Sequence, residues 1–362
     1  MQNSTEILHK EIAPGQDTWN RLILSYWQAN AVGLAVKLRL ADLLSGGPLP
    51  VDELAARTDT HEYALYRLMR ALESTGLFRE IAPRVFAQTA MSEFLRSDVP
   101  GSQASSMLHY LGKGNGPYDA WTELEFTVRT GKNALEKIYG CDFWEFLRRN
   151  THANDAMNGA MRSLSNVMTP AVATAYDWGR FPVIADIGGG IGSQIVAILD
   201  NFPTTTGILF DQSHVLASAI GHERLTVVDG NFFESVPQNA DAYLLRFVLH
   251  DWSDKEAMTI LRSVRQSMKP SASLILGEFI IPDGPGPDFS KWTDLQMMLL
   301  CRDARERTVR ELEALLAETG FRLEEVVKTG GPVTLVVAQS DGLHPAETAV
   351  TAIPQWSAQA KG

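Results

Sequence analysis

Three ionisable side chains at the ends of predicted elements have the types needed for acid–base chemistry. His250 follows the apolar run 242–249, Glu278 ends another apolar run, and Glu306 stands shortly before a predicted helix. An imidazole has an ordinary pKa of about 6.5, so it is mostly neutral near pH 7 and able to take a proton. A carboxylate beside the ring orients it and stabilises the imidazolium that forms. The residue types predict His250 as a general base flanked by Glu278 and Glu306.

A base of this kind suits an acceptor hydroxyl that is only weakly acidic. A phenol with a pKa near 10 is only about 0.1% ionised at pH 7, and its neutral form is a poor nucleophile. A metal site is a second interpretation, since His250, Asp251 and Glu278 are plausible ligands. Adjacent residues on an extended segment usually point apart, and no further His lies nearby in sequence, so we expect no metal. A surface histidine beside a helix cap is the third interpretation.

A glycine-rich turn indicates a ligand-binding loop. Gly188 and Gly190 follow the buried run 183–187, and a helical stretch comes next. Glycine lets a ligand approach the backbone without a β-carbon in the way. The dinucleotide fingerprint is incomplete because Ser193 stands where Gly or Ala is needed. Asp186, expected at the mouth of the loop, repels a pyrophosphate but suits a cation, which favours S-adenosylmethionine (SAM).

Further candidates for cofactor binding follow successive predicted strands. Asp211 ends the second strand, about 20 residues after the loop, where an acid accepts both ribose hydroxyls. Asn231 and Phe232 follow the third strand, where an amide can read the adenine edge and a ring can cover its face. Arg246 ends the fourth strand and needs an anionic partner, for which the cofactor carboxylate is a candidate. The structural alternatives are a tight turn for the glycine loop, a helix cap for Asp211 and core packing for Phe232.

The elements that position these residues form an α/β pattern. Short apolar runs alternate with helical stretches, which predicts a parallel sheet with helices on both faces. The runs are 183–187, 207–210, 225–228, 242–245, 273–277, 322–327 and 333–338. The link between the last two runs is too short for a helical crossover, so the last strand should run antiparallel.

The first hundred residues have a winged-helix pattern. Amphipathic stretches at 22–44, 51–57 and 61–76 precede two short strand-like runs, 77–80 and 85–88. DNA binding is disfavoured, because residues 1–100 hold 10 Lys+Arg against 12 Asp+Glu and phosphate affinity needs clustered positive charge. The apolar helices are expected to pack on each other or on a second subunit, and two-fold dimers are the commonest oligomers.

Composition narrows the class of protein further. The 362 residues carry a net charge of −11, which disfavours nucleic acid as a partner. No apolar run approaches the roughly 18 residues that span a bilayer, and the polar start 1–15 does not indicate export. Cys141 and Cys301 lack metal-ligand spacing and are expected to be reduced thiols in the cytoplasm.

We expect a domain at 1–110, a helical linker at 111–176, a SAM-binding domain at 177–340 and a loose tail at 341–362.

The chain resembles the plant-type family of SAM-dependent small-molecule O-methyltransferases, including bacterial members that act on polyketide and other antibiotic intermediates. The resemblance covers roughly Leu22 to Gln339. The motifs that carry it are Asp186-Ile187-Gly188-Gly189-Gly190, Phe210-Asp211, Gly230-Asn231-Phe232-Phe233, His250-Asp251-Trp252, Leu276-Gly277-Glu278 and Glu306-Arg307-Thr308. The family usually has Asp at the position of Asn231 and Lys at that of Arg246. Both replacements keep the required hydrogen-bonding types, so binding should survive.

The resemblance implies a class I methyltransferase fold, which is a Rossmann-like, mostly parallel seven-stranded sheet with an antiparallel last strand. It also implies an N-terminal winged-helix-like domain that forms a homodimer, His250 as general base, and Glu278 and Glu306 beside it. An acceptor pocket is implied along the middle helices and near Asp294. The residues expected to line it are Phe143, Met157, Met161, Asp294 and Met298. Met and aromatic side chains at helical spacing also fit a plain core.

The leading functional hypothesis is a SAM-dependent O-methyltransferase acting on an aromatic hydroxyl of a small specialised metabolite. A second hypothesis keeps the scaffold but changes the chemistry to C- or N-methylation, or to a reaction in which SAM is not consumed, because fold alone does not fix function. A third, non-enzymatic hypothesis is a winged-helix regulator that binds DNA in a salt-dependent way.

Overall fold

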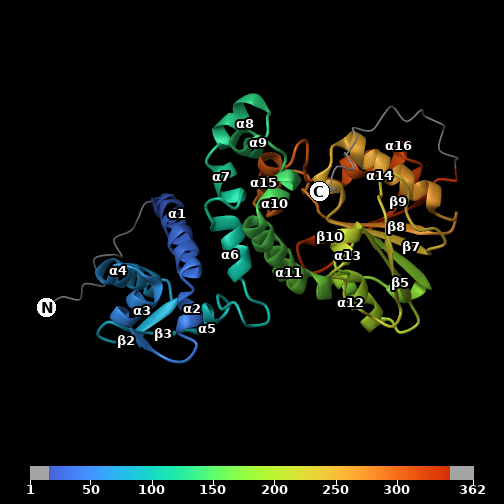
Figure 1. Cartoon of the computed structure of the whole chain (residues 1–362). Coiled ribbons are helices and arrows are strands. Elements are labelled where there is room, and N and C mark those ends of the chain that lie inside the picture. Colours follow the sequence, from blue (N-terminus) through green and yellow to red (C-terminus); the bar gives the residue numbers. More distant parts are fainter. Residues whose placement is uncertain (1–15, 343–362) are drawn as a thin grey trace. The chain divides into compact units, whose positions relative to one another are not determined.

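The computed structural model describes residues 16–342 and divides into two compact units, one extending to Val167 and one beginning at Met168 (Figure 1). The expected start, 1–15, and nearly all of the expected tail lie outside the described residues. The finer domain boundaries expected from the sequence remain a proposal. Between residues 16 and 342, no helix combines the length and the apolar character needed to cross a membrane.

The second unit is built on a seven-stranded sheet in the order β6-β5-β4-β7-β8-β10-β9. The strands are β4 (Val183–Ile187), β5 (Thr206–Asp211), β6 (Leu225–Asp229), β7 (Ala242–Arg246), β8 (Ser273–Phe279), β9 (Phe321–Lys328) and β10 (Val333–Ser340). Strand β10 runs antiparallel to both of its neighbours, β8 and β9. The expected class I methyltransferase sheet, with its antiparallel last strand, is confirmed.

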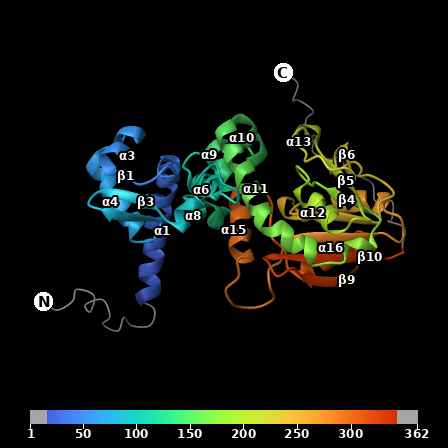
Figure 2. The ribbon, with the colours of Figure 1, turned by 90° about the horizontal axis from the view of Figure 1, so that it is seen from below.

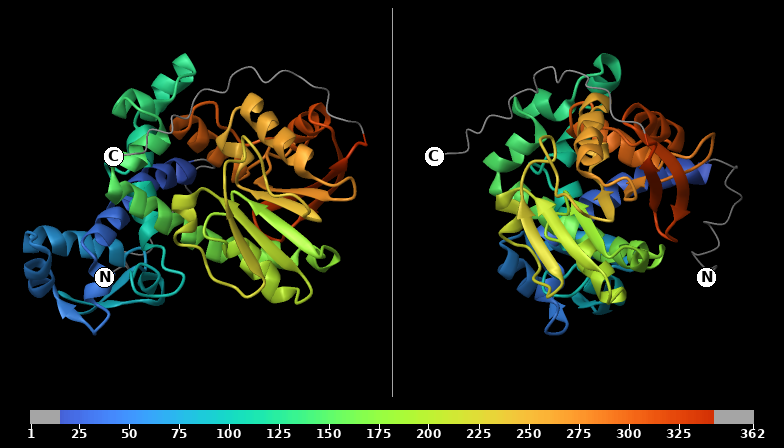
Figure 3. Two further views of the ribbon diagram at one scale, coloured as in Figure 1. Left: turned by 45° about the vertical axis from the view of Figure 1, so that its right-hand side comes forward. Right: turned by 90° about the vertical axis from the view of Figure 1, so that its right-hand side faces the viewer.

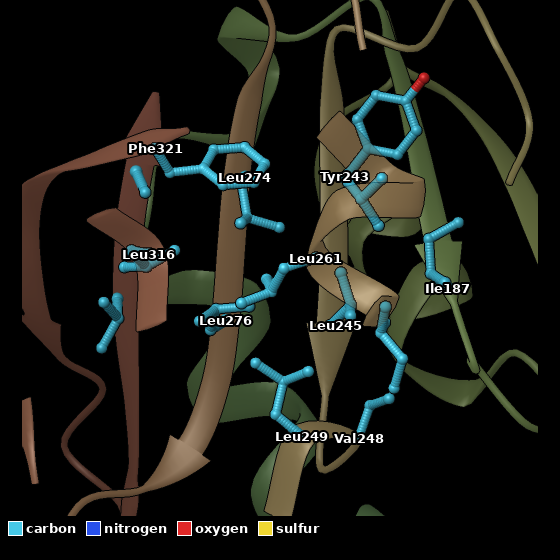
Figure 4. Packing of buried hydrophobic residues seen from close by; sticks show 14 of the residues in the cluster. Ile187, Tyr243, Leu245, Val248, Leu249, Leu261, Leu274, Leu276, Leu316 and Phe321 are labelled. Carbon is cyan, nitrogen blue, oxygen red and sulfur yellow. The ribbon is translucent and has the colours of Figure 1, made fainter. Parts of the chain in front are cut away.

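Helices cover both faces of this sheet. Helices α14 (Asp254–Ser267) and α16 (Val309–Glu318) lie on one face, and α12 (Ser193–Asn201) lies on the other (Figures 1 and 3). Leu245, Leu261, Leu276 and Leu316 meet in the core between the sheet and the first two helices (Figure 4). Full burial of each such side chain contributes about 1.5–3 kcal/mol, so this face is the main source of rigidity for the site.

The strand order creates the position at which a ligand should bind. Strand β4 pairs with β5 on one side and with β7 on the other, both in parallel. The crevice outside the carboxyl ends of the strands at such a reversal of order is where open α/β sheets bind ligands. The sequence places Asp186, Asp211, Arg246 and Glu278 at or next to these carboxyl ends.

The first unit begins with a winged-helix arrangement. Helices α3 (Val51–Thr58) and α4 (Glu62–Glu73) lie beside a three-stranded sheet of order β1-β3-β2 (Figures 1 and 2). The strands are β1 (Leu49–Pro50), β2 (Phe78–Ala82) and β3 (Val85–Gln88). This confirms the expected winged-helix-like domain. One helix boundary differs: α1 (Gln16–Lys37) ends before a left-handed Arg39 (φ 55°), and α2 (Leu40–Leu43) is separate, whereas the sequence predicted a single helix to residue 44.

Mainly helical elements fill the rest of the chain. They are α5 (Ala90–Glu93), α6 (Ala104–Leu111), α7 (Pro117–Trp121), α8 (Leu124–Thr130), α9 (Ala134–Tyr139), α10 (Phe143–Arg149), α11 (Thr151–Thr174), α13 (Ser213–Leu216), α15 (Ser290–Leu300) and the short 3₁₀ turns η2 (Trp178–Arg180) and η3 (Leu249–Asp251). Helix α11 continues through Pro170, although proline inside a helix normally breaks or kinks it. Met168, Val172 and Ala173 are buried around that position, so packing offsets the roughly 3 kcal/mol that proline costs inside a helix.

Candidate active site

The second unit brings the three expected catalytic side chains together. Strand β7 ends at Arg246, and the following turn η3 carries His250. The Nδ1 atom of His250 lies 3.3 Å from Oε1 of Glu306 and 4.0 Å from Oε2 of Glu278. Its Nε2 atom lies 3.6 Å from Oδ1 of Asp251. The two ring nitrogens thus face different carboxylates, Nδ1 that of Glu306 and Nε2 that of Asp251.

The two glutamates are held by backbone amides. Oε1 of Glu278 accepts hydrogen bonds from the amides of Val248 (3.3 Å) and Leu249 (3.0 Å), which fixes the turn before His250. The amide of Glu306 donates to Oδ1 of Asp294 at 3.0 Å. Glu278 and Glu306 are 3% and 2% exposed, and the Oε2 atom of each has no hydrogen-bond partner among residues 16–342. Asp294, expected to bind the acceptor, thus supports Glu306.

The carboxylates change the acid–base behaviour of His250. Burial by itself lowers the pKa of the imidazole, but Asp251, Glu306 and Glu278 outweigh it and raise the pKa to about 10. Burial raises the pKa of Glu278 to about 7, although the charge of His250 opposes this. The carboxylates therefore favour the protonated ring, in contrast to the ordinary pKa of about 6.5 from which the sequence argument started.

The same residues satisfy the minimum geometry for a metal ion. His250, Glu278 and Glu306 offer ligand atoms that all lie within 4.8 Å of one another. The sequence argument held that Asp251 would point away from His250, but the 3₁₀ turn brings the two side chains together. The absence of a metal remains a prediction.

The glycine loop follows β4 as expected. Gly188 (φ 69°) and Gly190 (φ 61°) have left-handed backbones, which glycine adopts without a steric cost. The amide of Gly190 donates to Oδ2 of Asp211 at 2.8 Å, so the acid that ends β5 lies against the loop. The turn that carries His250 also reaches the loop, since a β-carbon on Gly188 would lie 3.0 Å from Cγ2 of Val248.

We expect Gly189→Ala to weaken cofactor binding. The new β-carbon would lie 2.6 Å from Cδ1 of the buried Leu209 and 2.7 Å from the carboxylate of Asp186, so the loop must move. Overpacking of this kind costs about 1–3 kcal/mol, which corresponds to a loss of affinity of about 5- to 150-fold if it falls on binding. Calorimetric titration with S-adenosylhomocysteine (SAH) measures it. Gly221→Ala, where no atom would lie within 4 Å, is the control and should bind like wild type.

Asp186 and Arg246 interact at the carboxyl ends of β4 and β7. Asp186 is 1% exposed and buried beneath the loop rather than at its mouth. Burial raises its pKa to about 7, although Arg246 opposes this. Burial lowers the pKa of Arg246, and the charges of Asp186 and Glu278 oppose this shift only in part. The cofactor carboxylate as a further partner of Arg246 remains a prediction.

The residues after β6 are only partly engaged with the loop. The Phe232 ring would lie 3.6 Å from a β-carbon on Gly188, and it packs against Phe233 and Trp252. Asn231 is exposed, and its side chain bonds within its own turn, to the amide of Phe233 and to Glu234. Phe232 thus lies beside the loop, whereas Asn231 bonds within its own turn, and the roles of both in cofactor binding remain predictions.

The expected acceptor residues are distributed over both units. Phe143 is buried in α10, and Met157 and Met161 are partly buried on α11, all in the first unit. Asp294 and Met298 lie on α15 in the second unit. A shared acceptor pocket formed by these five residues remains a prediction.

Phe247 is a site residue that sequence reasoning missed. It has a left-handed backbone (φ 55°), which is rare for a bulky side chain. Its ring stacks on that of His250, with centroids 5.6 Å apart and planes inclined by 24°. An aromatic residue within an apolar run gives no sequence signal that separates it from a core residue, so only the structure identifies it.

Comparison with known proteins gives consistent matches. Residues 121–322 match the model of an O-methyltransferase domain, and residues 20–98 match that of an O-methyltransferase dimerisation domain. The phenazine O-methyltransferase PhzM of Lysobacter antibioticus is 36% identical over 88% of this chain and 94% of its own length. The mitomycin biosynthesis 6-O-methyltransferase of Streptomyces lavendulae is 34% identical over 90% and 94%. The solved structure of LaPhzM superposes with a TM-score of 0.84 at 36% identity, covering 91% of this chain and 100% of that one.

Two further matches bear on cofactor and reaction type. The O-methyltransferase NcsB1 of neocarzinostatin biosynthesis was solved with SAM and 2-hydroxy-5-methyl naphthoic acid (TM-score 0.72, 27% identity, 86% of this chain and 96% of that one). An 8-amino-8-demethylriboflavin N,N-dimethyltransferase of Streptomyces davaonensis is 34% identical over 81% of this chain and 86% of its own. Proteins similar to this chain thus include one that acts on nitrogen.

Proposed function

The chain belongs to the O-methyltransferase family, and from that premise we propose that it transfers the methyl group of SAM to a hydroxyl of a small aromatic metabolite, with His250 as general base. The observation that carries the proposal is the imidazole held by Glu306 on a turn that touches the glycine loop. Its cofactor is SAM, which supplies an electrophilic methyl group on a positively charged sulfur when bound.

The residues of the site fit a cationic cofactor. The glycine loop packs closely on Leu209 and Asp186, where a β-carbon on Gly189 has no room, while a β-carbon on Gly190 would meet no atom within 4 Å. Four acidic side chains, Asp186, Asp211, Glu278 and Glu306, lie at or near the carboxyl edge, against the two basic groups of Arg246 and His250. An excess of carboxylates favours a ligand with positive charge and disfavours a pyrophosphate.

His250 would act through Nε2. Its Nδ1 faces Glu306, which fixes the ring orientation, so Nε2 is the nitrogen that can take a proton from the acceptor hydroxyl. The ring must first lose the proton that the three carboxylates stabilise. A positive charge bound nearby opposes that stabilisation and lowers the pKa, so cofactor binding would prepare the base. The imidazolium formed in the reaction is then stabilised by Glu306 and Glu278.

The experiment that tests this proposal is a turnover assay with isotopically labelled SAM. The panel contains aromatic hydroxyl compounds and, as matched acceptors, the corresponding anilines and O-methyl ethers. We expect label in an ether product together with equimolar SAH, and no transfer to the pre-methylated ethers. Label in the aniline products instead would favour N-methylation, the second candidate, which the similarity to the riboflavin-analogue dimethyltransferase supports. SAM that is not consumed would contradict both.

We propose a homodimer formed through the first unit, acting in the cytoplasm. Helix α1 exposes large apolar side chains in the single chain, including Trp19 (67%), Tyr26 (63%) and Trp27 (61%). Contiguous apolar surface of this kind marks a protein interface. The balance of 10 Lys+Arg against 12 Asp+Glu in residues 1–100 does not favour nucleic acid as a partner.

Trp27→Glu is expected to convert the dimer into single chains, because a buried unpaired carboxylate opposes association. Light scattering should give twice the chain mass of 39.9 kDa for wild type and the single mass for the variant. A dimer that survives this substitution would place the interface elsewhere.

A further inference from the structure

Arg307 is almost completely buried, yet its guanidinium binds backbone rather than the catalytic side chains. The residue is 3% exposed. Nη1 donates to the carbonyl of Leu249 at 2.7 Å, and Nη2 donates to the carbonyl of Trp252 at 2.8 Å. Nε donates to Oδ1 of Asp254 at 2.9 Å. The two carbonyls lie on either side of His250, so one planar side chain grips both ends of the turn.

The segment that carries Arg307 makes two further contacts with this turn. The amide of Arg305 donates to the carbonyl of His250 at 2.9 Å. Glu306, the intervening residue, is the partner of the imidazole. Arg307 is itself tied to the edge of the sheet, since its carbonyl accepts from the amide of Ile281 at 3.1 Å and it forms a parallel bridge with Ile280.

Two groups therefore set the separation of His250 and Glu306. Glu278 holds the amide of Leu249, and Arg307 holds the carbonyl of the same residue. Since Glu306 and Arg307 are consecutive residues of one segment, a shift of the turn relative to Arg307 is also a shift of the imidazole relative to Glu306. Only arginine presents several donors in one rigid fork, so lysine cannot reproduce all three contacts.

We propose that Arg307 is a positioning residue for His250: its guanidinium locks the turn so that Nδ1 stays beside Glu306 and Nε2 stays directed at the acceptor. The proposal rests on the function proposed above for His250. Arg307 would act on the reaction through geometry alone, without touching cofactor or acceptor.

The test compares Arg307→Met and Arg307→Lys with wild type. We expect the kcat of the Met variant to fall about 100-fold, because a displacement of about 1 Å in a catalytic group has an effect of this size. The KM for the acceptor and the Kd for SAH should change by less than about threefold, since the guanidinium makes no binding contact in this arrangement. Lys should restore part of kcat. Arg310→Met, on the exposed side of α16, is the control for loss of a charge.

A second measurement separates positioning from simple loss of stability. NMR titration of the His250 ring in the SAH-bound protein, identified by its absence in His250→Ala, reports how close the carboxylates of Asp251, Glu278 and Glu306 remain. We expect a lower pKa in Arg307→Met as Glu306 and the ring separate. An unchanged titration, with a rate loss matching the loss of folded protein, would overturn the proposal.

Two further results of these experiments would also decide the proposal. If Arg307→Met does not fold, Arg307→Lys decides, and wild-type kcat with an unchanged titration in that variant refutes positioning. The titration requires no turnover, so a shift of the His250 pKa in a protein that methylates no hydroxyl would support positioning while refuting the proposed function.

Discussion

His250→Ala is expected to lower kcat by about 10³-fold while leaving SAH affinity within about threefold of wild type. The imidazole is the one side chain in the cluster that can accept a proton from the acceptor and have the resulting charge stabilised by Glu306, 3.3 Å away. Its removal leaves the acceptor to ionise by itself, and at pH 7 only about 0.1% of a phenol with a pKa of 10 is ionised. Single-turnover rates and calorimetry measure the two quantities separately.

The pH dependence of the residual rate of His250→Ala gives a second test. Without the base, the rate should rise about tenfold per pH unit towards the pKa of the acceptor, because the phenolate is then the reactive form. His222→Ala is the matched control, as this histidine lies beside Asp200, away from the catalytic turn, and should leave kcat unchanged. Turnover of His250→Ala equal to wild type at pH 7 would eliminate His250 as the base.

Glu306→Gln is expected to lower kcat by about 10²-fold and to move the acid limb of kcat/KM to lower pH. Glutamine keeps the shape of the side chain but removes a charge that is 2% exposed and faces Nδ1. Carboxylates raise the pKa of His250 to about 10, so loss of one lowers it. The base acts only when deprotonated, and its protonation limits the rate at low pH. A lower pKa therefore shifts the rising limb downward.

The sign of this shift gives a sharp test. The ratio of kcat/KM between Glu306→Gln and wild type should be higher at pH 6 than on the high-pH plateau of the two profiles. At pH 6 a larger fraction of the imidazole is neutral in the variant than in wild type. Glu313→Gln makes the same charge change on an exposed position of α16 and should leave the profile in place. If the acid limb of the kcat/KM profile lies at the same pH in Glu306→Gln as in wild type, this carboxylate does not control the pKa of the base.

The sheet and the order of its site residues could be predicted because both follow from local pattern. Apolar runs separated by helical stretches identify β4 to β10, and the short link before β10 requires an antiparallel return. His250 and Glu278 could be expected close together because the carboxyl ends of parallel strands meet at one edge. Glu306 ends no strand, and its place beside them was expected from its residue type and from the family resemblance.

Other properties depend on contacts distant in sequence. The depth of Asp186 and its proximity to Arg246 are set by packing between β4, β7 and β8, which a linear pattern does not reveal. The raised pKa of His250 needs Glu278 and Glu306 from two other segments as well as the neighbouring Asp251. The continuous helix through Pro170 needs buried neighbours on both sides. In each case tertiary environment overrides a correct local preference.

The left-handed backbone of Phe247 makes this position one where two contributions to folding stability oppose each other. A glycine there would relieve a conformation that costs a bulky residue about 1–3 kcal/mol. The same change deletes the ring that packs against His250 and Phe279. Loss of a core phenylalanine costs about 3–5 kcal/mol, so the packing of the ring offsets the unfavourable backbone beside the base.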